Sequence, residues 1–164
     1  MIQCYFDYAS SSWYSGITKQ LKQRLQAAQN KVIRFIHGYD FRTSLTVNDF
    51  KSIGWLNVEN RVKQLRLNHV HKIYNKKCPS YMYDNFQLVS DIHSHNSRYS
   101  KSNFYVQSVN SFTIDTFYYQ AIQDWNSLPP CVKNVRNKYE FKSKVKSVLV
   151  ENMKFKEEAD FIFY

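Results

Sequence analysis

Hydrophobic residues recur every three or four positions along most of the chain, which is the spacing of amphipathic helices. The clearest example is FYYQAIQDWNSLPP, residues 117–130, whose apolar positions share one helical face: Phe117, Ala121, Trp125 and Leu128. The two prolines that follow cannot continue the helix, because proline lacks an N–H and disfavours helix in the residue before it. This stretch therefore predicts a helix that ends before the prolines and buries the Trp125 indole in its last turn.

Two more helices are expected in residues 2–38. The first covers residues 2–14 and has one apolar face, at Ile2, Tyr5, Phe6, Ala9 and Trp13. Thr18 can cap the second, and Gly38 can end it. This second helix has an apolar stripe at Leu21, Leu25, Ala28, Val32 and Phe35. We expect the two helices to pack as an antiparallel pair.

A long helix is expected from Asn57, its cap, to about Lys76. It has two apolar faces, one at Val58, Val62, Leu65, His69 and Ile73 and the other at Leu67, Val70 and Tyr74. A helix that is apolar on two faces is largely buried, so this one should be central in the fold. In this interpretation His69 is a core histidine, and His71 lies off the stripe, near the surface.

Shorter elements lie between these helices. Thr46 and Asp49 resemble a capping box that starts a short helix, and Pro79 can begin another short helical turn. Residues 90–102 are polar and without periodicity, which indicates a loop. Residues 104–109 alternate between apolar and polar side chains and favour an extended conformation.

A last helix is expected after Asn137, which forms a capping box with Glu140. Its buried face is Phe141, Val145, Val148 and Leu149. The elements together predict a mainly α fold, a helical bundle of about five to seven helices with at most one short extended segment. The expected parts are a basic helical part, 1–76; a short helix with a polar loop, 77–110; a C-terminal helical part, 111–153; and a tail, 154–164.

Composition and charge sharpen this picture. A length of 164 residues fits one domain with a real core, and 17% aromatic residues with few glycines and prolines exclude a disordered chain. The formal net charge is +10, and residues 15–80 hold thirteen Lys and Arg against three acidic residues, a difference of ten. Residues 81–164 hold ten against nine. This asymmetry favours a polyanion-binding surface on the first half; the alternative is a basic surface that is merely solvated.

The cations of residues 18–37 are the leading candidates for a nucleic-acid contact. Beside the apolar stripe lie Arg24, Lys31 and Arg34, and farther round the helix lie Lys19 and Lys22. Uncharged donors on the same helix can also reach phosphates or base edges: Gln26, Gln29 and Asn30. The next long helix adds Arg61 and Lys72 on a shared face, and the last helix carries a second basic patch of Lys142, Lys144 and Lys146. The alternative for residues 18–37 is a packing helix with a solvated polar face.

The sequence contains no visible catalytic constellation. Its serines lack a glycine elbow, and its three glycines form no phosphate-binding loop. His93-x-His95 could chelate a metal only with further ligands, and no cysteine or carboxylate pair has the spacing of a zinc site. We therefore expect no catalytic residue, no metal and no cofactor, which leaves binding as the function.

The cysteines indicate the cellular environment. Cys4, Cys78 and Cys131 are odd in number and far apart, which favours reduced thiols in an intracellular protein, nuclear or cytoplasmic. The first residues do not have the pattern of a signal peptide, and no stretch approaches the roughly 20 apolar residues of a membrane span. We expect no membrane partner.

Several short motifs follow one another in order through residues 2–153: Tyr5-x-Asp7-Tyr8 with Trp13; Leu25-Gln26-x-x-Gln29-Asn30-x-x-x-Arg34; Gly54-Trp55-Leu56 with Arg61; Pro79-x-Tyr81; His93-Ser94-His95-Asn96-x-Arg98; Ala121-x-x-x-Trp125-Asn126-x-Leu128-Pro129; and Phe141-Lys142. In order and spacing, this series resembles the C-terminal region, the thumb and the part beyond it, of reverse transcriptases from non-LTR (LINE-type, jockey-like) retrotransposons. The resemblance covers nearly the whole chain.

This resemblance implies a fragment of an RNA-directed DNA polymerase that grips an RNA or DNA duplex backbone beside the polymerase palm. The paired metal-binding aspartates of the palm would lie upstream, and no Asp-Asp pair occurs in this sequence. The isolated chain is therefore expected not to be an enzyme, and its implied partners are the duplex and the upstream palm. The alternative is a non-catalytic helical interaction protein, or a relic fragment without a ligand of its own.

Overall fold

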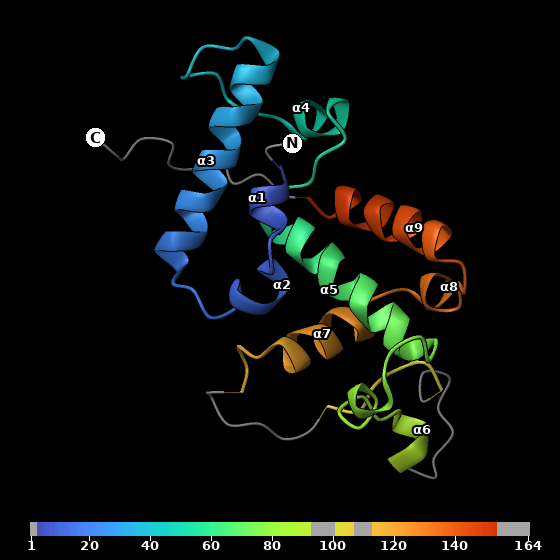
Figure 1. Ribbon diagram of the computed structural model, residues 1–164. Coiled ribbons are helices and arrows are strands. Elements are labelled where there is room, and N and C mark those ends of the chain that lie inside the picture. Colours follow the sequence, from blue (N-terminus) through green and yellow to red (C-terminus); the bar gives the residue numbers. More distant parts are fainter. Residues whose placement is uncertain (1–2, 93–100, 107–112, 154–164) are drawn as a thin grey trace.

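The computed structural model describes residues 3–92, 101–106 and 113–153, and these residues form a helical bundle (Figure 1). Its four longer helices are α3 (Lys19–His37), α5 (Val58–Tyr74), α7 (Phe117–Asn126) and α9 (Lys138–Glu151). The shorter ones are α1 (Gln3–Asp7), α2 (Ser10–Trp13), α4 (Val47–Ser52), α6 (Val89–Ile92) and α8 (Pro130–Lys133), with a 3-10 turn at Ser80–Met82. The expected mainly α fold is confirmed.

The expected extended segment is reduced to a single contact. Leu88 and Phe104 form an isolated antiparallel bridge, and the described residues contain no strand. Residues 107–109 of the expected segment lie outside the described residues. None of the described helices is long and apolar enough to cross a membrane.

Helix α5 occupies the centre of the bundle, as its two apolar faces predict. Helices α7 and α9 pack on it, and α1 and α2 lie against its first turns (Figure 1). Trp125, at the end of α7, is fully buried between these helices. Its ring lies 5.0 Å from the Tyr74 ring and 5.9 Å from the Phe141 ring, and its indole N–H donates to the Ser102 carbonyl at 2.9 Å. The predicted anchor is therefore part of the core.

The helix starts agree with the capping residues read from the sequence. The Thr18 hydroxyl accepts from the Leu21 N–H at 3.4 Å, and the Asn57 side chain accepts from the Asn60 N–H at 2.9 Å. The Asn137 side chain accepts from Tyr139 at 2.8 Å. Each cap satisfies an N–H that has no partner within its own helix, so short polar side chains set where the helices begin.

The expected helix over residues 2–14 is wrong. Ala9 has a φ of 47°, in the left-handed region, and divides the segment into α1 and α2. The break is stabilised by side chains, because the Trp13 indole donates to the Tyr8 carbonyl at 2.8 Å. Tyr5, expected on the buried face, is 81% exposed. Ile2 lies outside the described residues.

The assignment of the two histidines of α5 is also wrong. His71 is only 2% exposed, whereas His69 is exposed. The His71 Nε2–H donates to the Val135 carbonyl at 2.7 Å, and the ring stacks on Phe141 with centroids 4.0 Å apart. A polar side chain with such partners can occupy a buried face, and apolar periodicity does not detect it.

Because His71 is buried, its titration should appear in the stability of the fold. Burial lowers the pKa of His71 by more than its hydrogen bond to the Val135 carbonyl raises it. The unfolded chain therefore gains this proton first, so stability should be complete above about pH 6.5 and fall as the pH drops below it. We expect a loss of about 1.4 kcal/mol for each unit by which the pKa is lowered.

Chemical denaturation between pH 5 and 7.5 can measure this loss, with His71→Gln as the test variant and His69→Gln as its matched control. The pKa of His69 is also lowered, by partial burial and then by Lys72, but His69 is much more exposed to solvent than His71. We therefore expect His69→Gln to remove less of the pH dependence than His71→Gln. A pH dependence that is undiminished in His71→Gln would contradict the assignment.

Two buried charges connect distant segments. The Arg66 guanidinium of α5 contacts the Asp124 carboxylate of α7 at 2.7 and 2.8 Å and donates to the Ser15 hydroxyl at 3.0 Å. The Lys133 ammonium, on a residue only 2% exposed, donates to the Asn103 side chain at 2.7 Å and to the Asn126 carbonyl at 3.0 Å. Each charge is held by partners that replace its hydration, as buried charges require.

Candidate nucleic-acid interface

Helix α3 lies at the edge of the bundle and is joined to it through polar side chains (Figure 1). The Gln29 amide donates to the Leu56 carbonyl at 2.9 Å, and the Gln26 carbonyl oxygen accepts from the Val58 N–H at 3.0 Å. The Gln26 amide also donates to Asn30 at 2.8 Å. Two of the three amides that the sequence suggested as nucleic-acid contacts, Gln26 and Gln29, therefore connect α3 to residues 56–58, and Asn30 bonds with Gln26 within α3.

These bonds fix the rotation of α3 so that part of its predicted apolar stripe faces outward. Phe35 is 85% exposed, Leu21 is 44% exposed, and Ala28 is exposed as well. The expectation that the whole stripe packs against the preceding helix is wrong: only Leu25 packs beside Tyr14, and the buried positions of α3 are Gln29, Ile33 and Arg34. Pairing of the amides with backbone groups of residues 56–58 makes this orientation favourable.

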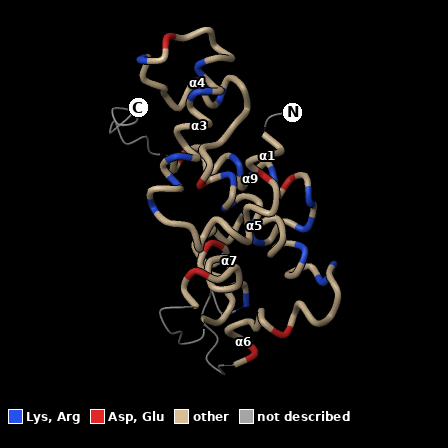
Figure 2. The backbone as a smooth tube through the Cα atoms, turned by 60° about the vertical axis from the view of Figure 1, so that its left-hand side comes forward, with Lys and Arg blue, Asp and Glu red and all other residues tan. Residues whose placement is uncertain are grey.

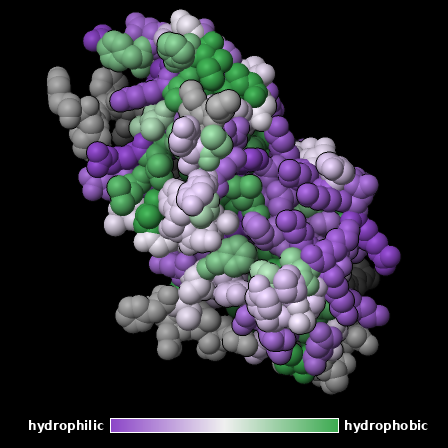
Figure 3. Space-filling view, in the orientation of Figure 1, coloured by the Kyte–Doolittle hydropathy of each residue, from purple (hydrophilic) through white to green (hydrophobic). Residues whose placement is uncertain are grey.

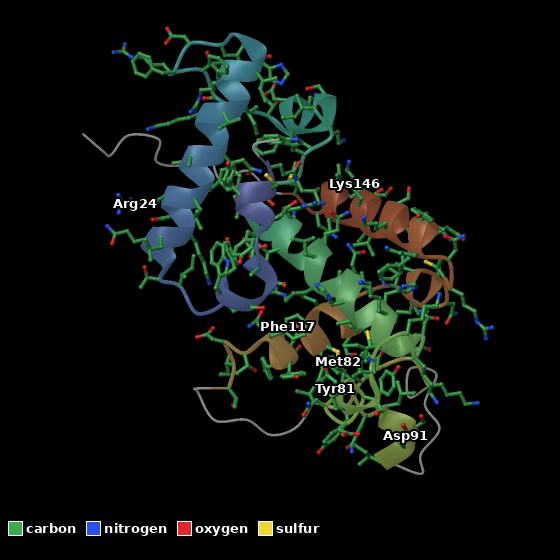
Figure 4. All side chains as sticks on the ribbon, in the orientation of Figure 1. Arg24, Tyr81, Met82, Asp91, Phe117 and Lys146 are labelled. Carbon is green, nitrogen blue, oxygen red and sulfur yellow. The ribbon has the colours of Figure 1, made fainter. Side chains whose placement is uncertain are left out.

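Two cations lie beside the exposed apolar residues of α3. Arg24 and Lys31 are exposed and follow Leu21 and Ala28 at a spacing of three, so the five residues Leu21, Arg24, Ala28, Lys31 and Phe35 form what we call the outer face of α3. In Figure 4 the Arg24 side chain points away from the bundle. Helix α3 has no acidic residue along its length, so these cations are not neutralised within the helix.

The other cations predicted on α3 have different positions. Lys19 is exposed at the first turn. The Lys22 ammonium lies 5.2 Å above the Tyr14 ring and 3.4 Å from the Ser15 carbonyl, which holds it against α2. Burial raises the pKa of that tyrosine to about 12, so its ring stays neutral. Arg34 is buried and donates to the Thr43 carbonyl at 2.8 Å.

The two cations predicted on α5 do not extend the outer face of α3. The Arg61 guanidinium donates to both carboxylate oxygens of Asp7, at 2.9 and 2.7 Å, and to Gln64 at 2.7 Å. Lys72 is half-buried near the other end of α5. Of the predicted set, the structure thus brings Arg24 and Lys31 to the outer face of α3 and leaves Lys19 exposed at the first turn, on a different side of the helix. Lys22, Arg34, Arg61 and Lys72 lie elsewhere.

A second cationic region lies between α1, α5 and α9, where the structure has an open cleft of about 370 Å³. Its polar side chains are Gln3, Arg61, Gln64, Lys142, Ser143 and Lys146, and we call it the α5–α9 cleft. Lys146, labelled on α9 in Figure 4, donates to the Gly54 carbonyl at 2.7 Å. Figure 2 shows the Lys and Arg positions along the backbone. The sequence indicated the lysine patch, but it could not show that Arg61 lies beside it.

The third lysine of that patch lies outside the cleft. Lys144 pairs with Glu140, one helical turn earlier, at 2.8 Å. Within the described ranges there is no group of three His, Cys, Asp or Glu side chains that could hold a metal. His93 and His95, considered above as ligands, lie outside the described residues.

Comparison of the chain with protein-family models, with curated proteins and with solved structures finds no match.

Proposed function

We propose that this chain is a nucleic-acid-binding helical module, the thumb and post-thumb region of a LINE-type reverse transcriptase without its palm, and that it contacts a duplex backbone. The observation that carries the proposal is the outer face of α3, where Arg24 and Lys31 stand exposed on a helix without acidic residues. The motif series resembling the retrotransposon family supports the same ligand. The proposed activity is binding, without nucleotide transfer.

The geometry of α3 suits a phosphate backbone. Arg24 and Lys31 are seven residues apart on one face, which is about 10 Å along a helix. The exposed Lys19 is a further cation at the first turn, on a different side of the helix. Cations arranged along one rod can each replace counterions that are condensed on a duplex. Such contacts carry no base information, so the binding should be insensitive to sequence and sensitive to salt.

The test is a salt titration of duplex affinity with the variant Lys19→Gln, Arg24→Gln, Lys31→Gln. Each lost phosphate contact should lower the log–log salt slope by about 0.9 on double-stranded DNA, so we expect a decrease of about 2–3 units. Arg34 is left intact because its burial would mix binding with folding. The decrease in the salt slope should be the same for duplexes of different sequence.

The matched control removes three exposed lysines elsewhere: Lys51→Gln, Lys77→Gln and Lys138→Gln. It has the same net charge as the test variant and should retain most of the slope. If both variants lose the slope equally, only the overall charge matters and the assignment to α3 is wrong.

A second candidate function is a protein-interaction module, which the exposed apolar residues around α3 favour. Phe35 and Phe41 are among the most exposed large hydrophobic residues, and Figure 3 shows apolar and polar residues interleaved over this part of the surface. Exposed apolar residues that cluster often mark a docking site. Phe35→Ser separates the two functions. If the chain binds a duplex through α3, the variant should keep the salt slope of duplex affinity. If the chain is a protein-interaction module, the variant should lose self-association in sedimentation.

A further inference from the structure

The α5–α9 cleft combines donors from three segments that are far apart in the sequence. Gln3 comes from α1, Arg61 and Gln64 from α5, and Lys142 and Lys146 from α9. Leu56 is the one apolar side chain in its lining, and no aromatic side chain contributes to it. The lining contains no carboxylate.

The charges of the cleft leave a positive excess. The acid nearest to Arg61 is Asp7, which binds the guanidinium through both oxygens, so this pair nearly cancels. Two ammonium groups, of Lys142 and Lys146, remain uncompensated in the lining. Lys146 uses one N–H on the Gly54 carbonyl, and an ammonium has two more to offer.

Arg61 is also held in place before any ligand arrives. Asp7 and Gln64 take three of its five N–H donors, at 2.7 to 2.9 Å. The guanidinium is therefore fixed at the cleft wall with two donors left over. Fixed donors lose little conformational entropy on binding, which raises the affinity for a matching anion.

We propose that the α5–α9 cleft is a binding site for a phosphate group, carried by a small polyphosphate or by the end of a nucleic-acid strand. Lysine and arginine donors match phosphate oxygens, whereas a base would need an aromatic platform that the lining lacks. The volume of about 370 Å³ lies at the lower end of small-ligand sites. The site uses none of the cations of α3, so it goes beyond the proposed function and does not depend on it.

The first experiment is calorimetric titration of the full chain with inorganic tripolyphosphate. Lys142→Gln and Lys146→Gln should each weaken binding by about tenfold, as expected for loss of a charge-assisted hydrogen bond. Lys144→Gln is the control, because it lies on the same helix but outside the cleft and should leave affinity unchanged. Lys142 is exposed, so its variant tests the site without disturbing the core.

The second arm compares a duplex bearing 5′-phosphates with the same duplex bearing 5′-hydroxyls. A preference for the phosphorylated ends that disappears in Lys142→Gln identifies a strand end as the ligand; tripolyphosphate binding without that preference identifies a small polyphosphate. Tripolyphosphate binding, and any preference for phosphorylated ends, must also be found with the Lys19, Arg24, Lys31 variant, even if duplex binding through α3 fails. The proposal is overturned if tripolyphosphate does not bind, if Lys144→Gln weakens it equally, or if a polyglutamate peptide binds as tightly through the same lysines.

Discussion

Replacement of Trp125 by alanine should destabilise the fold by roughly 3–5 kcal/mol, the cost of removing a large aromatic side chain from a packed core. The indole is completely buried and contacts rings from three other segments, those of Tyr74, Phe104 and Phe141. None of these can fill the space alone, so the variant loses transfer free energy and also leaves a cavity.

Denaturant unfolding monitored by circular dichroism provides the measurement, with Trp125→Phe as control. The phenylalanine keeps most of the apolar contact but cannot replace the indole N–H that donates to the Ser102 carbonyl. We expect it to cost about 1–3 kcal/mol, near the penalty for leaving a partly buried acceptor without its partner. A loss below about 1 kcal/mol for Trp125→Ala would show that the indole is not a core residue in solution.

Asp124→Leu should be comparably damaging, because it leaves a buried cation without its partner. Arg66 is 6% exposed, and its guanidinium contacts Asp124 at 2.7 Å. Removing one member of a buried ion pair typically costs about 3–5 kcal/mol, although the intact pair itself adds little net stability. Thermal or denaturant unfolding at neutral pH will measure the loss.

Two variants give this prediction its controls. Lys63 also contacts Asp124, at 3.3 Å, but it is partly exposed, so Lys63→Met should cost no more than about 1 kcal/mol. The double variant Arg66→Met, Asp124→Leu removes both buried charges and should be clearly more stable than Asp124→Leu alone. If the double variant is as unstable as the single one, lost packing rather than the unpaired charge explains the effect.

The features that were predictable from the sequence depend on neighbouring residues. The caps Thr18, Asn57 and Asn137 act within three positions of themselves, and the burial of Trp125 and Phe141 follows from apolar spacing along one helix. The lysine patch on the last helix was visible for the same reason. Such signals locate helices and their strongest anchors.

The features that were missed depend on partners far along the chain. Gln29 bonds with a carbonyl 27 residues away, His71 with one 64 residues away, and Arg66 with an acid 58 residues away. Periodicity assigns these polar side chains to the surface. It therefore predicts the wrong inner face for α3 and exchanges the roles of His69 and His71. The convergence of Arg61 with Lys142 and Lys146 has the same origin, because only the packing of α5 on α9 brings them together.

Acylation of the buried Lys133 amine can report local opening of the fold. Burial lowers the pKa of its amine, which increases the neutral, nucleophilic fraction, yet the closed structure gives an acylating reagent almost no access. Labelling at this position therefore requires the corner formed by Asn103, Asn126 and Lys133 to open. The exposed Lys142 reacts without such opening and serves as the reference. The labelling rate of Lys133 divided by that of Lys142 therefore measures how often α7, α8 and the 101–106 segment separate in the otherwise native protein.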